Sequence, residues 1–150
     1  MRKLYRFILN QPTVISLLIF FLLGYIIPSL LFIPTIIAGN EIRLNNPILP
    51  SKRYFEIILI VPIFETFVFQ YLAGKILRKF VKNLLILCVL LGILFSVSHW
   101  FSLHYLIYTF ADGFILAFAF FYYKKRHNEF VSFVLVSLIH IAHNGLAMLV

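Results

Sequence analysis

Residues 54–74 read YFEIILIVPIFETFVFQYLAG, a run of 21 residues that is apolar almost throughout and carries Glu65 near its middle. A helix that crosses a bilayer needs about 20 mostly apolar residues, so this stretch is predicted to span the membrane. Four more apolar stretches of similar length lie at residues 13–38, 83–101, 104–123 and 130–150. The pattern predicts an all-α fold, a polytopic integral-membrane helix bundle with about five transmembrane helices, in a single membrane domain covering residues 1–150.

The boundaries of the first stretch carry two further expectations. Pro28 and Pro34 predict a kink in this helix or its end near Pro34, because proline removes a main-chain donor. The polar stretch 39–53, which is rich in asparagine and proline, is predicted to be a loop.

The composition of the chain excludes a soluble globular protein. Of its 150 residues, 63% are hydrophobic and 12% charged, with a mean hydropathy of +1.02. A soluble domain is about 45–50% apolar and about 25% charged. The single cysteine, Cys88, excludes a disulfide framework and a cysteine-rich metal site. The formal charge of +8 comes from basic residues placed between hydrophobic stretches, which predicts contact with the lipid bilayer and no nucleic-acid partner.

The basic residues are distributed unevenly between the two sides of the predicted bundle. Ten of the 13 precede the first stretch or join the second to the third and the fourth to the fifth. Arg43, Lys52 and Arg53 lie in the predicted loop. Because basic residues collect in cytoplasmic loops, a cytoplasmic N-terminus is expected. The aromatic residues predicted to anchor the bundle at the membrane interface are Tyr54, Trp100, Tyr105, Tyr122 and Tyr123.

Several polar side chains lie inside the predicted spans, where they are energetically costly. A charged group in the hydrocarbon costs about 2.5–3.5 kcal/mol on insertion scales, so each is a candidate functional residue. These residues are Glu65, Gln70, His99, Asp112, His140, His143 and Asn144. The last three share one helix face because they are three and four residues apart.

These residue types are compatible with three kinds of site. A carboxylate beside imidazoles could act as a general base toward water, and a neutral histidine and an asparagine amide could stabilise an oxyanion. The same groups could form a polar network that only holds helices together. Glu65, His99 and His140 are also acceptable zinc ligands. The residues alone leave these alternatives open.

Three motifs follow one another along the chain. They are PIFETFVFQ at residues 62–70, Phe95-x-x-x-His99 and His140-x-x-x-Asn144. In order, spacing and helix placement they resemble the motifs of the CAAX-protease and bacteriocin-processing (CPBP, or Abi) family of membrane proteins, over residues 54–150. The resemblance implies a glutamic intramembrane endopeptidase that hydrolyses a peptide or protein substrate in or at the membrane. The expected location is the inner membrane of a bacterial cell.

The resemblance also implies roles for individual residues. Glu65 and His99 would activate the attacking water. His140 and Asn144 would line the side of the site where the oxyanion forms. No metal cofactor is expected, and zinc held by Glu65, His99 and His140 is the alternative.

The first motif departs from the family pattern at two positions. The family has a second glutamate and an arginine where this chain has Thr66 and Gln70. These positions are four residues apart on one helix face, so we expect a neutral hydrogen-bonding pair in place of an ion pair. The loss of both charges favours an alternative function, that of a non-catalytic membrane protein that confers bacteriocin self-immunity or binds a partner.

The residues assigned supporting roles are Thr66, Gln70 and His143. His143 is expected either to support the site as a donor or to face a polar cavity. Asp112 belongs to none of the three motifs and is expected to be a buried hydrogen-bonding residue.

Overall fold

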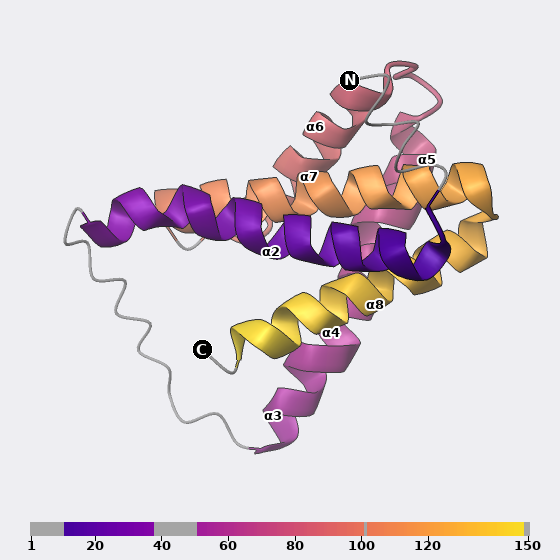
Figure 1. Ribbon diagram of the computed structural model, residues 1–150. Coiled ribbons are helices and arrows are strands. Elements are labelled where there is room, and N and C mark those ends of the chain that lie inside the picture. The colour runs from indigo at the N-terminus through magenta and orange to yellow at the C-terminus, as the bar shows by residue number, and fades with distance from the viewer. Residues whose placement is uncertain (1–10, 38–50, 101, 149–150) are drawn as a thin grey trace.

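The computed structural model describes residues 11–37, 51–100 and 102–148, and every regular element in these ranges is a helix (Figure 1). The first helix, α2, spans Thr13–Ile37. The second covers residues 51–77 as five consecutive segments: α3 (Ser51–Phe55), η1 (Glu56–Ile60), α4 (Val61–Glu65), η2 (Thr66–Ala73) and α5 (Gly74–Leu77), of which η1 and η2 are π-helical. The remaining helices are α6 (Leu84–Val97), α7 (Leu103–Arg126) and α8 (Glu129–Ala147).

The helices occupy all five predicted stretches. Four are long and apolar enough to cross a membrane, over Thr13–Leu31, Arg53–Leu77, Leu103–Arg126 and Glu129–Ala147. The third stretch forms α6, which is equally apolar but has only 14 residues. The predicted all-α membrane bundle is therefore confirmed, with one helix markedly shorter than the others.

One predicted boundary, the end of the loop at Arg53, is wrong. The last described residue of α2 is Ile37, three residues after Pro34, so a kink in this helix or its end near Pro34 stays a prediction. Residues 51–53 of the predicted loop already belong to the second helix, and residues 39–50 lie outside the described residues.

Polar side chains fix where three of the helices begin. The Asn83 carboxamide oxygen accepts hydrogen bonds from the main-chain N–H groups of Leu85 and Ile86 at the start of α6. Ser102 caps α7 and Asn128 caps α8 in the same way. Each cap satisfies donors that have no partner within the first turn of the helix.

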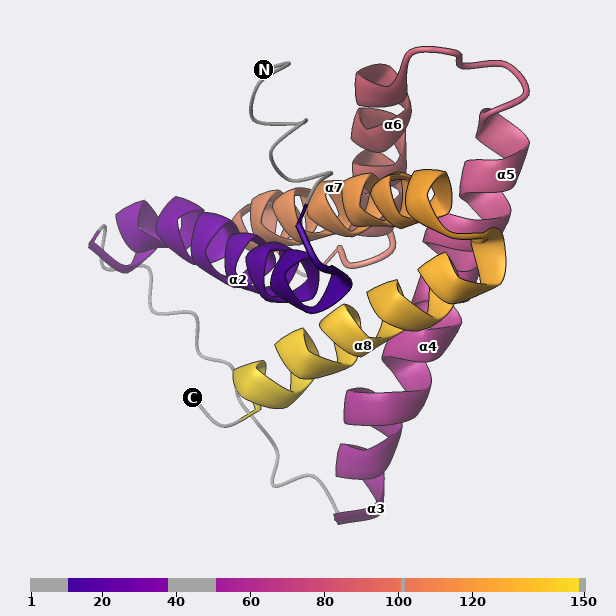
Figure 2. The same ribbon diagram turned by 45° about the vertical axis from the view of Figure 1, so that its right-hand side comes forward.

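The helix α7 lies at the centre of the bundle, with α2, α6 and α8 packed against it (Figure 2). Its C-terminal half contributes Phe120, Tyr122 and Tyr123 to the core, each at most 2% exposed. The predicted interfacial position of Tyr122 and Tyr123 is therefore wrong. Their hydroxyl groups find partners inside the protein, since Arg126 donates to Tyr122 at 2.8 Å and Ser16 lies 3.2 Å from Tyr123.

Two glycines allow helices to approach closely around the polar interior. A Cβ atom on Gly113 of α7 would lie 2.7 Å from the Cβ of Phe95 on α6. A Cβ atom on Gly24 of α2 would overlap the ring of His143 on α8. Small residues are enriched where membrane helices pack tightly. These two therefore bring α7 against Phe95 and α2 against His143.

Candidate active site

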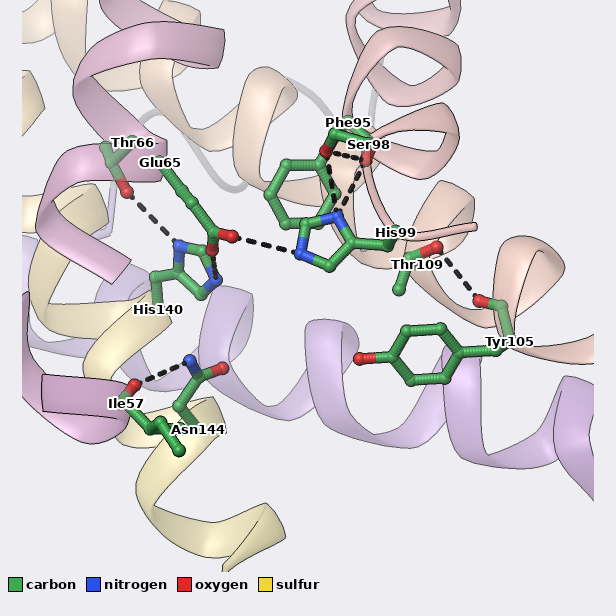
Figure 3. Close-up of polar contacts among 10 residues, drawn as sticks. All are labelled: Ile57, Glu65, Thr66, Phe95, Ser98, His99, Tyr105, Thr109, His140 and Asn144. Carbon is green, nitrogen blue, oxygen red and sulfur yellow. Dashed lines mark hydrogen bonds and ion pairs between the residues drawn. The ribbon is translucent and has the colours of Figure 1, made fainter. Parts of the chain in front are cut away.

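Glu65 contacts two histidines from two other parts of the chain (Figure 3). It is the last residue of α4, and its side chain is 16% exposed. Its Oε1 lies 3.0 Å from Nε2 of His99, and its Oε2 lies 3.5 Å from Nε2 of His140. The structure thus brings together the carboxylate and both imidazoles that the motifs predict for the site.

His99 is held just beyond the end of α6 by its other ring nitrogen. Nδ1 lies 2.8 Å from the carbonyl oxygen of Phe95 and 3.0 Å from the hydroxyl of Ser98 (Figure 3). A carbonyl oxygen can only accept, so Nδ1 carries a hydrogen. Since Nε2 faces a carboxylate oxygen at 3.0 Å, a proton also lies between His99 and Glu65. The two side chains therefore form a pair that shares a proton.

His140 faces the other oxygen of Glu65 from α8. The ring is 2% exposed, and its Nδ1 lies 3.3 Å from the hydroxyl oxygen of Thr66. Its edge packs against the Phe95 ring, with centroids 5.6 Å apart. The 3.5 Å separation from Glu65 is longer than an ordinary hydrogen bond, so the ring is directed at the carboxylate without being tightly bound to it. Such contacts commonly shorten when substrate binds.

Asn144 lies one turn beyond His140 and uses its amide to hold two helices together. Its Nδ2 donates to the carbonyl oxygen of Ile57 at 3.1 Å (Figure 3). In the π-helical segment η1, the N–H of Val61 bonds to the carbonyl of Glu56, five residues earlier. The same register would pair Ile57 with residue 62, which is a proline without an N–H. Asn144 therefore supplies the donor that Pro62 cannot.

This arrangement predicts an energetic coupling between Asn144 and Pro62. Asn144→Ala is expected to lower the free energy of unfolding by about 1–3 kcal/mol, because it leaves the Ile57 carbonyl without a donor inside the membrane. In a Pro62→Ala background, the new N–H of residue 62 can serve that carbonyl, so the same substitution should cost clearly less. Unfolding of the four proteins in mixed micelles measures the coupling. Equal costs in the two backgrounds would contradict this role for Asn144.

Thr66 and Gln70 are both fully buried, but they do not form the predicted pair. The Thr66 hydroxyl contacts His140, and the Gln70 amide nitrogen and oxygen have no hydrogen-bond partner within the described part of the chain. Both residues lie in the π-helical segment η2, and the Thr66 hydroxyl is directed to His140 on α8 and not to Gln70. Thr66 is therefore joined to the site, whereas Gln70 is not.

His143 and Asp112 form a second pair, which uses neither Glu65 nor His99. His143 Nδ1 lies 3.0 Å from Asp112 Oδ1, at an ion-pair distance although off the line of a well-directed hydrogen bond. On the opposite side of the ring, Nε2 lies 3.0 Å from the carbonyl oxygen of Phe21. The pair joins α8, α7 and α2, and both side chains are nearly buried. The expected burial of Asp112 is confirmed, but its contact with His143 is an ion pair in place of the expected hydrogen bond.

The zinc alternative has a geometric requirement. Zinc binds nitrogen and oxygen ligands at about 2.0–2.2 Å, with the ligands converging on one point. Across the residues that the structure describes, no three histidine, cysteine, aspartate or glutamate side chains form such a group. Zinc at Glu65, His99 and His140 stays a hypothesis for chemical analysis.

The family model described as type II CAAX prenyl endopeptidase Rce1-like matches residues 49–146, which include Glu65, His99 and His140. No curated protein and no solved structure matches the chain.

Proposed function

The chain belongs to the Rce1-like family of type II CAAX prenyl endopeptidases, and from this premise we propose that Glu65 and His99 activate water for cleavage of a peptide bond. Family membership implies a protease in general and, with the four long apolar helices, an integral membrane protein. A protease of this family suggests a peptide or protein substrate at the membrane. The observation that carries the proposal is the 3.0 Å contact between Glu65 and His99.

The proposed base is the Glu65 carboxylate. With the shared proton on His99, the carboxylate can take a proton from a water molecule as the water oxygen attacks the carbonyl carbon of the peptide. The pair then returns this proton to the nitrogen of the leaving amine. One water is consumed, the carbon–nitrogen bond breaks, and a new carboxyl end and a new amino end result.

The proposed oxyanion donor is Nε2 of His140. As water attacks, negative charge develops on the former carbonyl oxygen, and a hydrogen-bond donor fixed beside it lowers the barrier. His140 is nearly fully buried and directed toward Glu65, which supports this assignment. The family-implied role of Asn144 beside the oxyanion would fall to its second N–H, since one already serves Ile57.

A second candidate function is that of a non-catalytic membrane protein that confers bacteriocin self-immunity or binds a partner. The observation in its favour is that the neutral residues Thr66 and Gln70 replace the second glutamate and the arginine of the family's first motif. The proposed location, under either function, is the inner membrane of a bacterial cell.

Cleavage by the purified protein tests the proposed function. The protein is incubated in lipid nanodiscs with membrane-anchored peptides that end in a cysteine-containing tail, each made with and without a prenyl group. Mass spectrometry is expected to show a product shortened at one peptide bond. If no peptide is cut but one binds tightly, the binding function is supported. Zinc at one ion per chain that is lost on Glu65→Gln would overturn the expectation of no metal.

A further inference from the structure

Thr66 directly follows the proposed base in the sequence, and its side chain points to the second histidine of the site (Figure 3). The residue is fully buried, and its Oγ1 lies 3.3 Å from Nδ1 of His140. The side chains therefore form a chain of polar contacts. His99 contacts Glu65, Glu65 contacts His140, and His140 contacts Thr66.

The direction of the Thr66–His140 hydrogen bond decides where His140 carries its hydrogen. A neutral imidazole has one N–H and one acceptor nitrogen. Nε2 faces an oxygen of Glu65, and a carboxylate oxygen can only accept. If Nε2 carries the hydrogen, Nδ1 must accept, and the partner on that side must donate. A threonine hydroxyl can do so, because it is both a donor and an acceptor.

We propose that Thr66 is a positioning residue, whose hydroxyl donates to Nδ1 of His140 and thereby holds the ring in the tautomer that directs Nε2–H toward Glu65. The tautomer itself follows from the contacts of His140. Its value for catalysis rests on the proposed function, because only a protonated Nε2 can donate to an oxyanion beside Glu65.

Nδ1 then has opposite hydrogen-bonding roles in the two histidines of the site: it donates in His99 and accepts in His140. The main-chain carbonyl of Phe95 accepts from Nδ1 of His99, so Nε2 of that ring is left to share a proton with Glu65. The Thr66 hydroxyl donates to Nδ1 of His140, so Nε2 of that ring is a donor only. His99 is therefore the partner that shares a proton with the base, and His140 is a neutral hydrogen-bond donor, although both rings face the same carboxylate.

Nuclear magnetic resonance of protein labelled with ¹⁵N-histidine tests the tautomer directly, because protonated and unprotonated ring nitrogens have distinct chemical shifts. The His140 signals are assigned by their loss in a His140→Gln variant. The full chain in lipid nanodiscs is expected to show His140 protonated on Nε2 alone. Thr66→Val keeps the side-chain shape but removes the donor, so the Nδ1 signal should shift as it loses its hydrogen bond, and both ring signals should broaden as the ring loses its fixed orientation. Thr66→Ser should keep the wild-type tautomer.

A matched control is Thr109→Val, since Thr109 is also buried but its hydroxyl donates only to main-chain carbonyls of its own helix. This variant should leave the His140 signals unchanged. If the wild-type protein has His140 protonated on Nδ1 or on both nitrogens, or if Thr66→Val does not alter the ring, the proposal is wrong.

Kinetics give a second measurement that separates this proposal from the proposed function. If wild-type protein cleaves peptides, Thr66→Val should lower kcat by about 10–100-fold, the range found when a hydrogen-bond partner that orients a metal-bound histidine is lost. KM should stay near the wild-type value, and Thr66→Ser should restore the rate. An unchanged kcat would overturn the positioning role while the protease function stands. If wild-type protein cleaves nothing, the protease function fails and the tautomer measurement alone decides the role of Thr66.

Discussion

Glu65→Gln is expected to lower kcat for peptide cleavage by about 10²–10⁴-fold, the contribution that a positioned general base usually makes. Glutamine keeps the length and hydrogen-bonding reach of the side chain toward His99 and His140. Its amide oxygen cannot take a proton from water at neutral pH. The measurement is single-turnover cleavage of a peptide substrate in nanodiscs, with folding followed by the thermal unfolding transition, which should change little.

Glu56→Gln is the matched control, because it makes the same change on the same long helix at an exposed position. That variant should cleave at the wild-type rate. Cleavage by Glu65→Gln at a rate close to wild type would refute Glu65 as the base. Where the protein protects cells against a bacteriocin, protection that survives Glu65→Gln would instead support function by binding.

The second large effect is expected from His143→Leu, which should lower the free energy of unfolding by about 3–5 kcal/mol. The substitution leaves the Asp112 carboxylate buried between α7 and α8 without its partner, and an unpaired buried charge is strongly destabilising. A native protein is commonly stable by only about 5–15 kcal/mol, so this loss should be visible as a large fall in the unfolding transition in mixed micelles.

The double variant Asp112→Leu/His143→Leu separates the loss of the partner from the loss of packing. It removes both members of the pair, and replacing a buried ion pair by apolar residues of similar size is often neutral or stabilising. The double variant should therefore be more stable than His143→Leu alone. A double variant that is less stable would show that the destabilisation comes from packing around Gly24 and not from the unpaired carboxylate.

The convergence of Glu65, His99 and His140 was predictable because each signal is local. An apolar stretch long enough to span a bilayer can only be a helix there, which specifies the helices without any knowledge of their packing. A polar residue in the middle of such a helix is expected to turn toward other helices and away from lipid. Glu65 and His140 are two such residues, and His99 directly follows the end of α6, so these three side chains are expected to contact one another.

The neighbours of these residues were less predictable, because they depend on how whole helices pack. The contact between Asp112 and His143 forms only if α7 and α8 cross where these two residues face each other. No local sequence pattern predicts the position of that crossing. The burial of Tyr122 and Tyr123 has the same origin, since an aromatic residue near the end of a helix is equally suited to an interface and to a core. Only the packing of α2 on α7 decides between them.

The contact between Asn144 and Ile57 could have been inferred in part from Pro62. A proline inside a membrane helix always leaves one earlier carbonyl without a donor, so a polar side chain from another helix is to be expected nearby. Which carbonyl is left depends on whether the helix is locally α or π. The sequence predicts a helix at this place, but the π-helical register of η1 was found only in the structure.

The shortness of α6 has a consequence for the lipid around the site. At 1.5 Å per residue, its 14 residues rise by about 21 Å at most, whereas the hydrocarbon layer is about 30 Å thick. The basic residues Arg78, Lys79 and Lys82 precede α6 and should hold its start at one membrane surface. Its other end, next to His99, then stops roughly 9 Å or more inside the opposite surface at any tilt. Local thinning of the bilayer is one way in which a short span is accommodated, and it would bring water closer to Glu65, so membrane thickness itself should govern how readily water reaches the site.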